Sequence, residues 1–354
     1  TSRKQNSVFR DDWLALFNNI KGNIYFNKGE LDTALTCYQN GLSLGNSIPN
    51  SYISSLTILN IGTVYYAKSD LTLALRYCQQ SKAIAERIGN SALIAYSLFV
   101  IGGIYREKGD PDKALEYFQQ SLALDDPKSS DIFPAEKLYF LIITCLDQQN
   151  QAKAQKFLDR LKELYAHSQN RYIHLRIQLA EALILKQSPR LKHIAQAQAI
   201  LEKIVKEEMI EFSLTASAMI HLCDLLILEI KATGEQEQWE RVKTLIQSLY
   251  AKAHTQQAFS MIIDLLLLQA KFAVVEGRLQ EAQQLYEEAK IIAAEKHLGL
   301  LAQKVEAEYT NFKIEIEKWQ AFIQLNTPLG KRLEQAQMTE YLKEVQKIVR
   351  RSTM

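Results

Sequence analysis

The stretch SLFVIGGIYREKGDPDKALEYFQQSLAL, residues 97–124, decides the fold of this chain. It holds two apolar segments of helical character on either side of Gly109, Asp110 and Pro111. Glycine tolerates the left-handed backbone that ends a helix, aspartate accepts hydrogen bonds from the free amides that begin the next one, and proline favours the first helical position. The stretch therefore predicts a helix, a tight turn and a second helix.

The same pattern occurs twice upstream, at steps of 40 residues. The repeating columns are Gly22, Gly62 and Gly102; Tyr25, Tyr65 and Tyr105; Ala34, Ala74 and Ala114; and Tyr38, Cys78 and Phe118. Small residues in both helices allow the two halves of a hairpin to approach closely. Because one hairpin cannot bury both of its faces, a neighbouring hairpin must cover the remainder, so stability comes from stacking.

The order Gly, Tyr, Gly-Asp, Ala and aromatic in residues 97–124 resembles the tetratricopeptide repeat (TPR). The 40-residue period is similar to the arrays of kinesin light chains and of G-protein-modulator scaffolds. The resemblance implies an all-α fold, a right-handed TPR superhelix (an α-solenoid) of about seven helical hairpins plus C-terminal capping helices. It also implies that the first helices of the hairpins line a concave groove.

The chain is predicted to divide into four segments that differ in how closely they keep the repeat pattern. Residues 1–126 carry three regular repeats, residues 131–254 carry three degenerate repeats, and residues 255–324 carry a seventh repeat and a capping helix. Residues 330–351 form an amphipathic helix, whose apolar stripe is Met338, Leu342, Val345 and Val349. That helix could pack on the seventh repeat, mediate self-association, or dock on a partner or membrane surface, and packing within the chain is the favoured interpretation.

Composition restricts the partners. The net charge is only +2 and no long run of Lys and Arg forms a basic stripe, which argues against nucleic acid as the main partner. The four cysteines form no CxxC pair, and this favours buried thiols in a reducing, cytoplasmic setting. The polar start of the sequence lacks a secretory signal, and the most apolar segment, residues 262–275, is too short to span a bilayer, so a membrane role is disfavoured.

Catalytic signatures are missing from the sequence. It contains no Gly-rich phosphate loop, no HExxH and no GxSxG motif, and its six histidines are dispersed. We therefore expect no enzymatic activity, no cofactor and no metal site.

Candidate binding residues come from the family resemblance, transferred position by position from the repeat glycine. The groove-facing candidates are Asn19, Asn23, Phe26, Asn27, Asn60, Thr63, Tyr66 and Arg106. Asparagine both donates and accepts, so a row of asparagines can pair with the backbone of an extended peptide whatever its side chains. The alternative is that these asparagines simply face solvent. Since Asn19, Tyr96 and Val100 stand where chaperone-binding relatives carry cations, a C-terminal chaperone tail is not the expected ligand.

These observations predict a non-enzymatic adaptor or scaffold that binds a peptide or helical segment of a partner protein. The alternative function is a peptide-sensing regulatory module of a signalling or transcription regulator, because a repeat array can change its pitch on binding.

Overall fold

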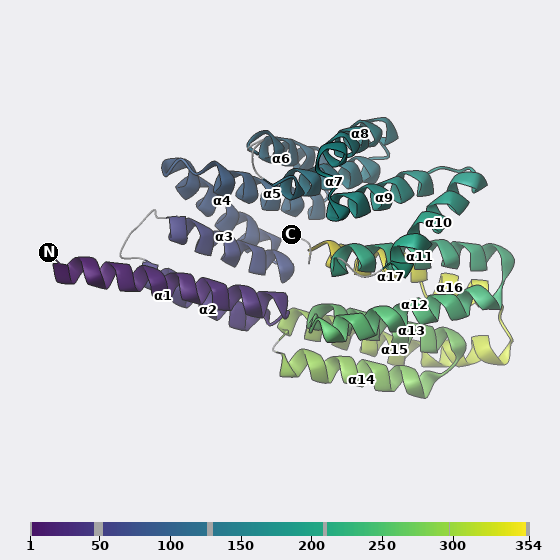
Figure 1. Ribbon diagram of the computed structural model, residues 1–354. Coiled ribbons are helices and arrows are strands. Elements are labelled where there is room, and N and C mark those ends of the chain that lie inside the picture. The colour runs from purple at the N-terminus through teal and green to yellow at the C-terminus, as the bar shows by residue number, and fades with distance from the viewer. Residues whose placement is uncertain (1, 46–51, 126–129, 208–210, 297, 352–354) are drawn as a thin grey trace. The chain divides into compact units, whose positions relative to one another are not determined.

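The computed structural model describes residues 2–45, 52–125, 130–207, 211–296 and 298–351 (Figure 1). These residues form 17 α-helices and no strand. Within each of the two units described below, most consecutive helices pack against one another as hairpins, and neighbouring hairpins pack together. The predicted all-α solenoid is therefore confirmed.

The chain divides into two compact units. The N-terminal unit comprises residues 1–26 and 31–200, and the C-terminal unit comprises residues 27–30 and 201–353. This division differs from the four segments expected from the repeat signatures, which stay predictions. The expected boundary at residue 126 lies outside the described residues.

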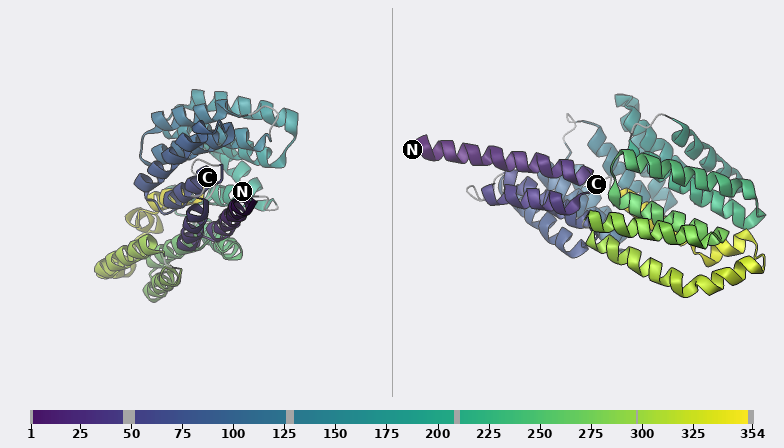
Figure 2. Two further views of the ribbon diagram at one scale, coloured as in Figure 1. Left: turned by 90° about the vertical axis from the view of Figure 1, so that its left-hand side faces the viewer. Right: turned by 90° about the horizontal axis from the view of Figure 1, so that it is seen from below.

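The helices of the N-terminal unit follow one another in pairs along the chain, coloured from purple to teal in Figure 2. They are α1 (Ser2–Asn27) with α2 (Leu31–Gly45), α3 (Tyr52–Ala67) with α4 (Leu71–Arg87), α5 (Ser91–Glu107) with α6 (Pro111–Ala123), α7 (Ile132–Asp147) with α8 (Gln151–Ser168), and α9 (Arg171–Lys186) with α10 (Leu191–Lys206), which runs on into residues of the second unit.

The turns inside the hairpins have the predicted chemistry. Ser69 and Gly109 adopt positive φ values of 65° and 77° at the ends of α3 and α5. Asp70 then accepts a hydrogen bond from the Leu73 amide, and Asp110 accepts one from the Lys113 amide. These caps satisfy backbone donors that the first turn of each second helix would otherwise leave open.

Close approach explains the glycine column. A Cβ built on Gly22 would lie 2.4 Å from the Tyr38 ring, one on Gly62 would lie 2.7 Å from the Cys78 sulfur, and one on Gly102 would lie 2.7 Å from the Phe118 ring. The second helix therefore places a side chain directly against each glycine, an aromatic ring at Gly22 and Gly102 and the Cys78 thiol at Gly62. Aromatic pairs close the same hairpins: Tyr65 stacks on Tyr77, and Tyr105 stacks on Tyr117.

The C-terminal unit contains the remaining helices of the chain. Its helices are α11 (Phe212–Thr233), α12 (Gln236–Thr255), α13 (Phe259–Glu276), α14 (Leu279–Glu295), α15 (Gly299–Gln324), α16 (Leu329–Gln335) and α17 (Met338–Arg351). The prediction of one helix over residues 330–351 was wrong, because the chain turns at Gln337, whose φ is 50°, and so separates α16 from α17.

Two further expectations concern burial. All four cysteines, Cys37, Cys78, Cys145 and Cys223, are buried and form no disulfide bond. Within the described residues, α11 is the one helix long and apolar enough to cross a membrane, whereas the sequence argument had singled out residues 262–275. Since 89% of its most apolar window is buried inside the protein, α11 resembles the core helix of a globular protein and is weak support for a membrane span.

Candidate functional site

The predicted asparagines of the first two repeats come together at the contact between α1 and α3. Asn60 Nδ2 donates to Asn19 Oδ1 at 3.1 Å and lies 3.4 Å from Asn23 Oδ1. Asn19 Nδ2 donates to Thr57 Oγ1 at 2.6 Å. Asn19 and Asn60 are both buried, with exposed fractions of 2% and 8%, so these two side chains join neighbouring hairpins.

Asn23 is the exposed member of this network. Its Oδ1 accepts from the Tyr38 hydroxyl at 2.6 Å as well as facing Asn60. Burial raises the pKa of Tyr38 far above its ordinary value, so the phenol stays protonated and donates. These donors engage the carboxamide oxygen of Asn23, whereas its amide nitrogen donates no hydrogen bond within the described residues.

The remaining predicted residues are divided between surface and packing. Asn27 is exposed and Phe26 is half-buried, both near the end of α1. Thr63 and Tyr66 are buried on α3. Arg106 on α5 forms an ion pair with Asp147 on α7, at 2.5 Å, and so links the third and fourth hairpins. A role of these residues in peptide binding stays a prediction.

A second surface was not recognised in the sequence: the face of α11 and α13 on which α17 lies (Figure 1). Met338, Leu342, Val345 and Val349 of α17 are almost completely buried. The sequence had favoured packing of this stripe within the chain, on the seventh repeat. In the structure the helix contacts the first helices of both the sixth and the seventh hairpin.

Polar and aromatic contacts fix α17 on this surface. The ring of Tyr341 lies 4.7 Å from the Lys271 ammonium and 5.5 Å from the Lys304 ammonium, within cation–π range. Lys304 also pairs with the buried Asp264 carboxylate at 2.6 Å. At the far end of α17, Gln346 Nε2 lies 3.3 Å from His221 Nδ1.

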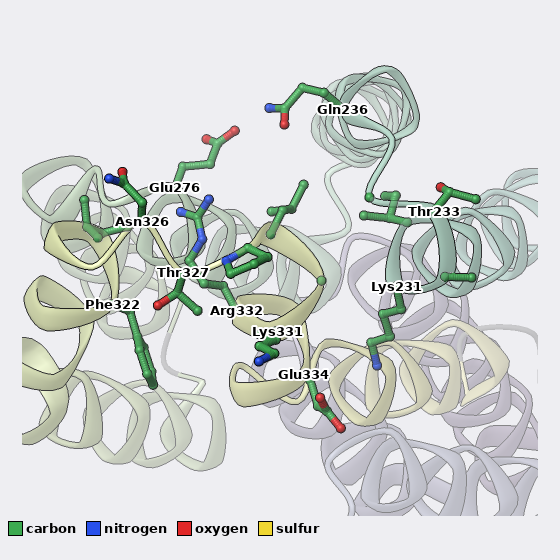
Figure 3. A pocket seen from close by; sticks show the side chains of 17 residues that line it. Lys231, Thr233, Gln236, Glu276, Phe322, Asn326, Thr327, Lys331, Arg332 and Glu334 are labelled. Atoms are coloured by element: carbon green, nitrogen blue, oxygen red, sulfur yellow. The ribbon is translucent and has the colours of Figure 1, made fainter.

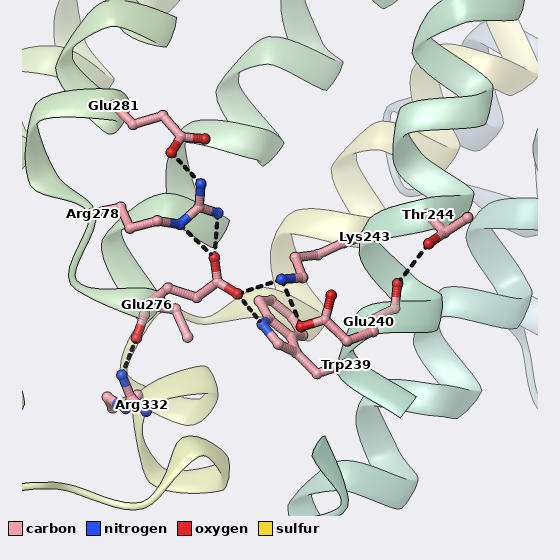
Figure 4. Close-up of polar contacts among 9 residues, drawn as sticks. Trp239, Glu240, Lys243, Thr244, Glu276, Arg278, Glu281 and Arg332 are labelled. Carbon is pink, nitrogen blue, oxygen red and sulfur yellow. Dashed lines mark hydrogen bonds and ion pairs between the residues drawn. The ribbon is translucent and has the colours of Figure 1, made fainter. Parts of the chain in front are cut away.

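Glu276, the last residue of α13, is the centre of a polar cluster (Figure 4). Its carboxylate accepts hydrogen bonds from Trp239 Nε1 and Lys243 Nζ, both at 2.7 Å, and from Arg278 Nε at 2.8 Å. Burial opposes ionisation of this carboxyl group, but the hydrogen bonds from Lys243, Trp239 and Arg278 outweigh it and hold the pKa of Glu276 below its ordinary value of 4.5.

This cluster gives a pH-dependent prediction. A folded-state pKa below the unfolded value contributes stability that is present above pH 4.5 and is lost as the pH falls through the folded pKa. At neutral pH, Glu276→Gln should lower the free energy of unfolding by about 2 kcal/mol, because hydrogen bonds to a charged group are lost. In urea denaturation curves the gap between the variant and the native chain should shrink as the pH is lowered below 4.5. Glu317→Gln, at an exposed position, is the control, and a gap that widens on acidification would contradict the assignment.

A cavity of about 900 Å³ lies inside the C-terminal unit, between the end of α11 and the segment from α15 to α16 (Figure 3). Lys231, Lys331 and Arg332 line it together with Glu276 and Glu334. Arg332 donates to the Val275 carbonyl, and burial lowers its pKa. Charges of both signs therefore line its walls. Among the described residues no group of three His, Cys, Asp or Glu side chains could hold a metal ion.

Comparison with protein families identifies the repeats. The model of the MalT-like TPR region matches residues 13–298, about four fifths of the chain. The chain belongs to this family. The matched region includes residues 131–254, in which the TPR signature is weak.

Solved structures share the fold at low sequence identity. A Rap protein in complex with Competence and Sporulation Factor has a TM-score of 0.52 at 11% identity, with coverage of 86% of this chain and 76% of that one. Aspartyl phosphate phosphatase F from Bacillus subtilis has a TM-score of 0.53 at 13% identity, with coverage of 82% and 72%. A search of curated proteins gives no significant sequence match. The family and the fold indicate a protein-interaction or regulatory repeat module, and TPR arrays are in general a non-enzymatic interaction fold.

Proposed function

We propose that this chain is a non-enzymatic adaptor that binds a peptide or helical segment of a partner protein along the first helices of its N-terminal repeats. The observation that carries the proposal is the orientation of Asn23. Tyr38 and Asn60 engage its carboxamide oxygen, so its N–H groups are positioned to donate to a backbone carbonyl of a bound segment. Backbone recognition of this kind supplies affinity without demanding a particular side chain.

The burial of Asn19 and Asn60 narrows the proposed site. These two residues hold the position of Asn23, and exposed Asn27 lies one turn further along α1.

The net charge of +2 supports a protein partner over nucleic acid. The four buried cysteines, none of which forms a disulfide bond, support a cytoplasmic location, where thiols stay reduced.

Asn23→Asp tests the proposed site. The carboxylate still accepts from Tyr38 and Asn60, but it cannot donate to a bound peptide. Peptides selected from a random display library on the native chain should bind this variant a fewfold to tenfold more weakly, which corresponds to the loss of about one hydrogen bond.

The matched control is Asn40→Asp, because Asn40 is exposed on α2 outside the network. It adds the same charge and should leave peptide binding unchanged. If the selected peptides bind the Asn23 variant as tightly as they bind the native chain, the site is not at Asn23. If both variants weaken binding equally, charge rather than the lost donor is responsible.

The regulatory alternative is favoured by a different observation. A repeat surface in this chain already holds an amphipathic helix, α17, and such an occupied surface suits a module that changes state when a ligand arrives. The Rap structure that shares the fold also contains a bound factor. A regulatory module should change its small-angle scattering profile when a selected peptide binds, whereas a passive adaptor should not.

A further inference from the structure

The face of α11 and α13 that α17 contacts is apolar and needs another element to cover it. A helix at the surface of a stack is normally apolar on one face only, whereas α11 and α13 carry buried residues around their whole circumference. Their second helices, α12 and α14, cover one side of each, and α17 covers another. Without α17, the apolar face of these two helices would be open to solvent.

The covering helix can leave this surface without exposing a wholly apolar helix to water. On its outer side Glu340, Lys343, Glu344 and Lys347 are exposed, so α17 is strongly amphipathic. It joins the rest of the chain through Gln337, a non-glycine residue at φ 50°.

The fit between α17 and its surface is incomplete. Tyr341 is 7% exposed, and its hydroxyl has no hydrogen-bond partner among the described residues. A buried hydroxyl in that state costs about 1–3 kcal/mol relative to a paired one. The contact between Gln346 and His221 is long, at 3.3 Å. Lys271, which pairs with Glu308, and Lys304, which pairs with Asp264, both lie within cation–π range of the Tyr341 ring, so this position of the surface suits an aromatic residue of a bound helix.

We propose that the face of α11 and α13 is a binding site for an amphipathic helix of a partner protein, and that α17 occupies the site until the partner displaces it. The partner helix carries an aromatic residue for the two lysines and aliphatic residues at the spacing of Met338, Leu342, Val345 and Val349. Recognition by i, i+4, i+7 and i+11 anchors is the usual mode for a helix in a groove. This site is separate from the one proposed at Asn23, and either can fail without the other.

A peptide with the sequence of residues 338–351 is the probe, because the site already accepts that sequence. In the full chain the tethered α17 has an effective concentration in the millimolar range, so the free peptide should compete poorly. Leu342→Asp places a charge in the buried stripe and should release α17 from the site. The labelled peptide should then bind the full-length variant at least about tenfold more tightly than the native chain, by fluorescence anisotropy.

Lys343→Asp is the matched control, since Lys343 lies on the exposed side of α17. It should leave peptide binding at the native level. Equal peptide binding by Leu342→Asp and by the native chain would overturn the proposal. A released variant that forms dimers through exchanged α17 helices would assign the site to a second copy of this chain and would likewise overturn the partner helix.

If Leu342→Asp unfolds the C-terminal unit, hydrogen exchange on the native chain still tests the proposal. A displaceable helix should open on its own, so amides of α17 should exchange at least about tenfold faster than the central amides of α11 and α13. Tyr341→Phe removes the buried hydroxyl and should slow that exchange. Protection of α17 equal to that of α11 and α13 would show that it opens only with the whole unit, which would overturn the proposal.

Discussion

Trp239→Ala is expected to lower the free energy of unfolding of the C-terminal unit by about 3–5 kcal/mol, in the range of buried aromatic truncations. Trp239 on α12 is completely buried, and its ring meets Phe272 of α13 edge-on with centroids 4.7 Å apart. Its indole N–H also donates to Glu276 (Figure 4). The substitution therefore opens a cavity between the sixth and seventh hairpins and removes one donor from a buried carboxylate.

Chemical denaturation of the full chain, followed by circular dichroism, measures this effect. Trp239→Phe is the matched variant, because it keeps most of the ring contact with Phe272 and loses the N–H donor. It should cost less, about 1–2 kcal/mol. A loss below about 1 kcal/mol for the alanine variant would contradict the burial of Trp239, since large values are typical of cavity formation in a core.

Phe118→Ala should have an effect of similar size, about 3–5 kcal/mol, in the N-terminal unit. The Phe118 ring is completely buried and lies 5.5 Å from the Phe99 ring and 5.7 Å from the Phe140 ring, measured between centroids. It therefore joins the third hairpin to the fourth. Phe133→Ala is the control, because Phe133 on α7 is 61% exposed and its loss should change stability by less than about 0.5 kcal/mol.

Gly102 lies against the Phe118 ring, so substitutions at these two positions should compensate for one another. Gly102→Ile should itself destabilise by about 1–3 kcal/mol, because even a Cβ at Gly102 would lie 2.7 Å from the Phe118 ring. Adding Phe118→Leu should recover part of that loss. The fourth hairpin already carries this combination, since Ile142 and Leu158 stand 40 residues after Gly102 and Phe118 and are both buried. If the double variant is as unstable as the sum of the two single variants, the two side chains do not share one space.

The regular hairpins could be predicted because their determinants are local. Gly109, Asp110 and Pro111 decide where α5 ends and α6 begins, through backbone conformation and capping that involve only near neighbours. The 40-residue period then transfers the same solution to the preceding hairpins. Even the fourth hairpin, which lacks the glycine, follows in register because Ala154 and Leu158 keep their columns.

The candidate site was less predictable, because the burial of a side chain in a solenoid depends on how each hairpin rotates on its neighbour. Asn19 and Asn60 occupy positions that the family resemblance assigns to the groove, yet their amides bond to each other across α1 and α3. The sequence period specifies their spacing but not this rotation. Only the polar character of the residues was available as a signal, and polar residues serve equally well at a surface or in a buried network.

The position of α17 on α11 and α13 could not be predicted from the sequence, for a different reason. Gln346 and His221 approach one another across 125 positions of the chain, and no periodicity links them. One signal was present: α11 and α13 are apolar around their circumference and so require cover on more than one side. That signal predicts that some element covers them, but it does not say which.

The reactivity of the buried cysteines can reveal the opening of each unit separately. Thiolates rather than thiols react with disulfide reagents, and burial raises the pKa of Cys78 to about 12 and also raises that of Cys145. Cys37, Cys78 and Cys145 belong to the N-terminal unit, and Cys223 belongs to α11 of the C-terminal unit. Titration of the native chain with a chromogenic thiol reagent therefore distinguishes opening of the two units. The number of thiols that react at each stage shows which unit has opened.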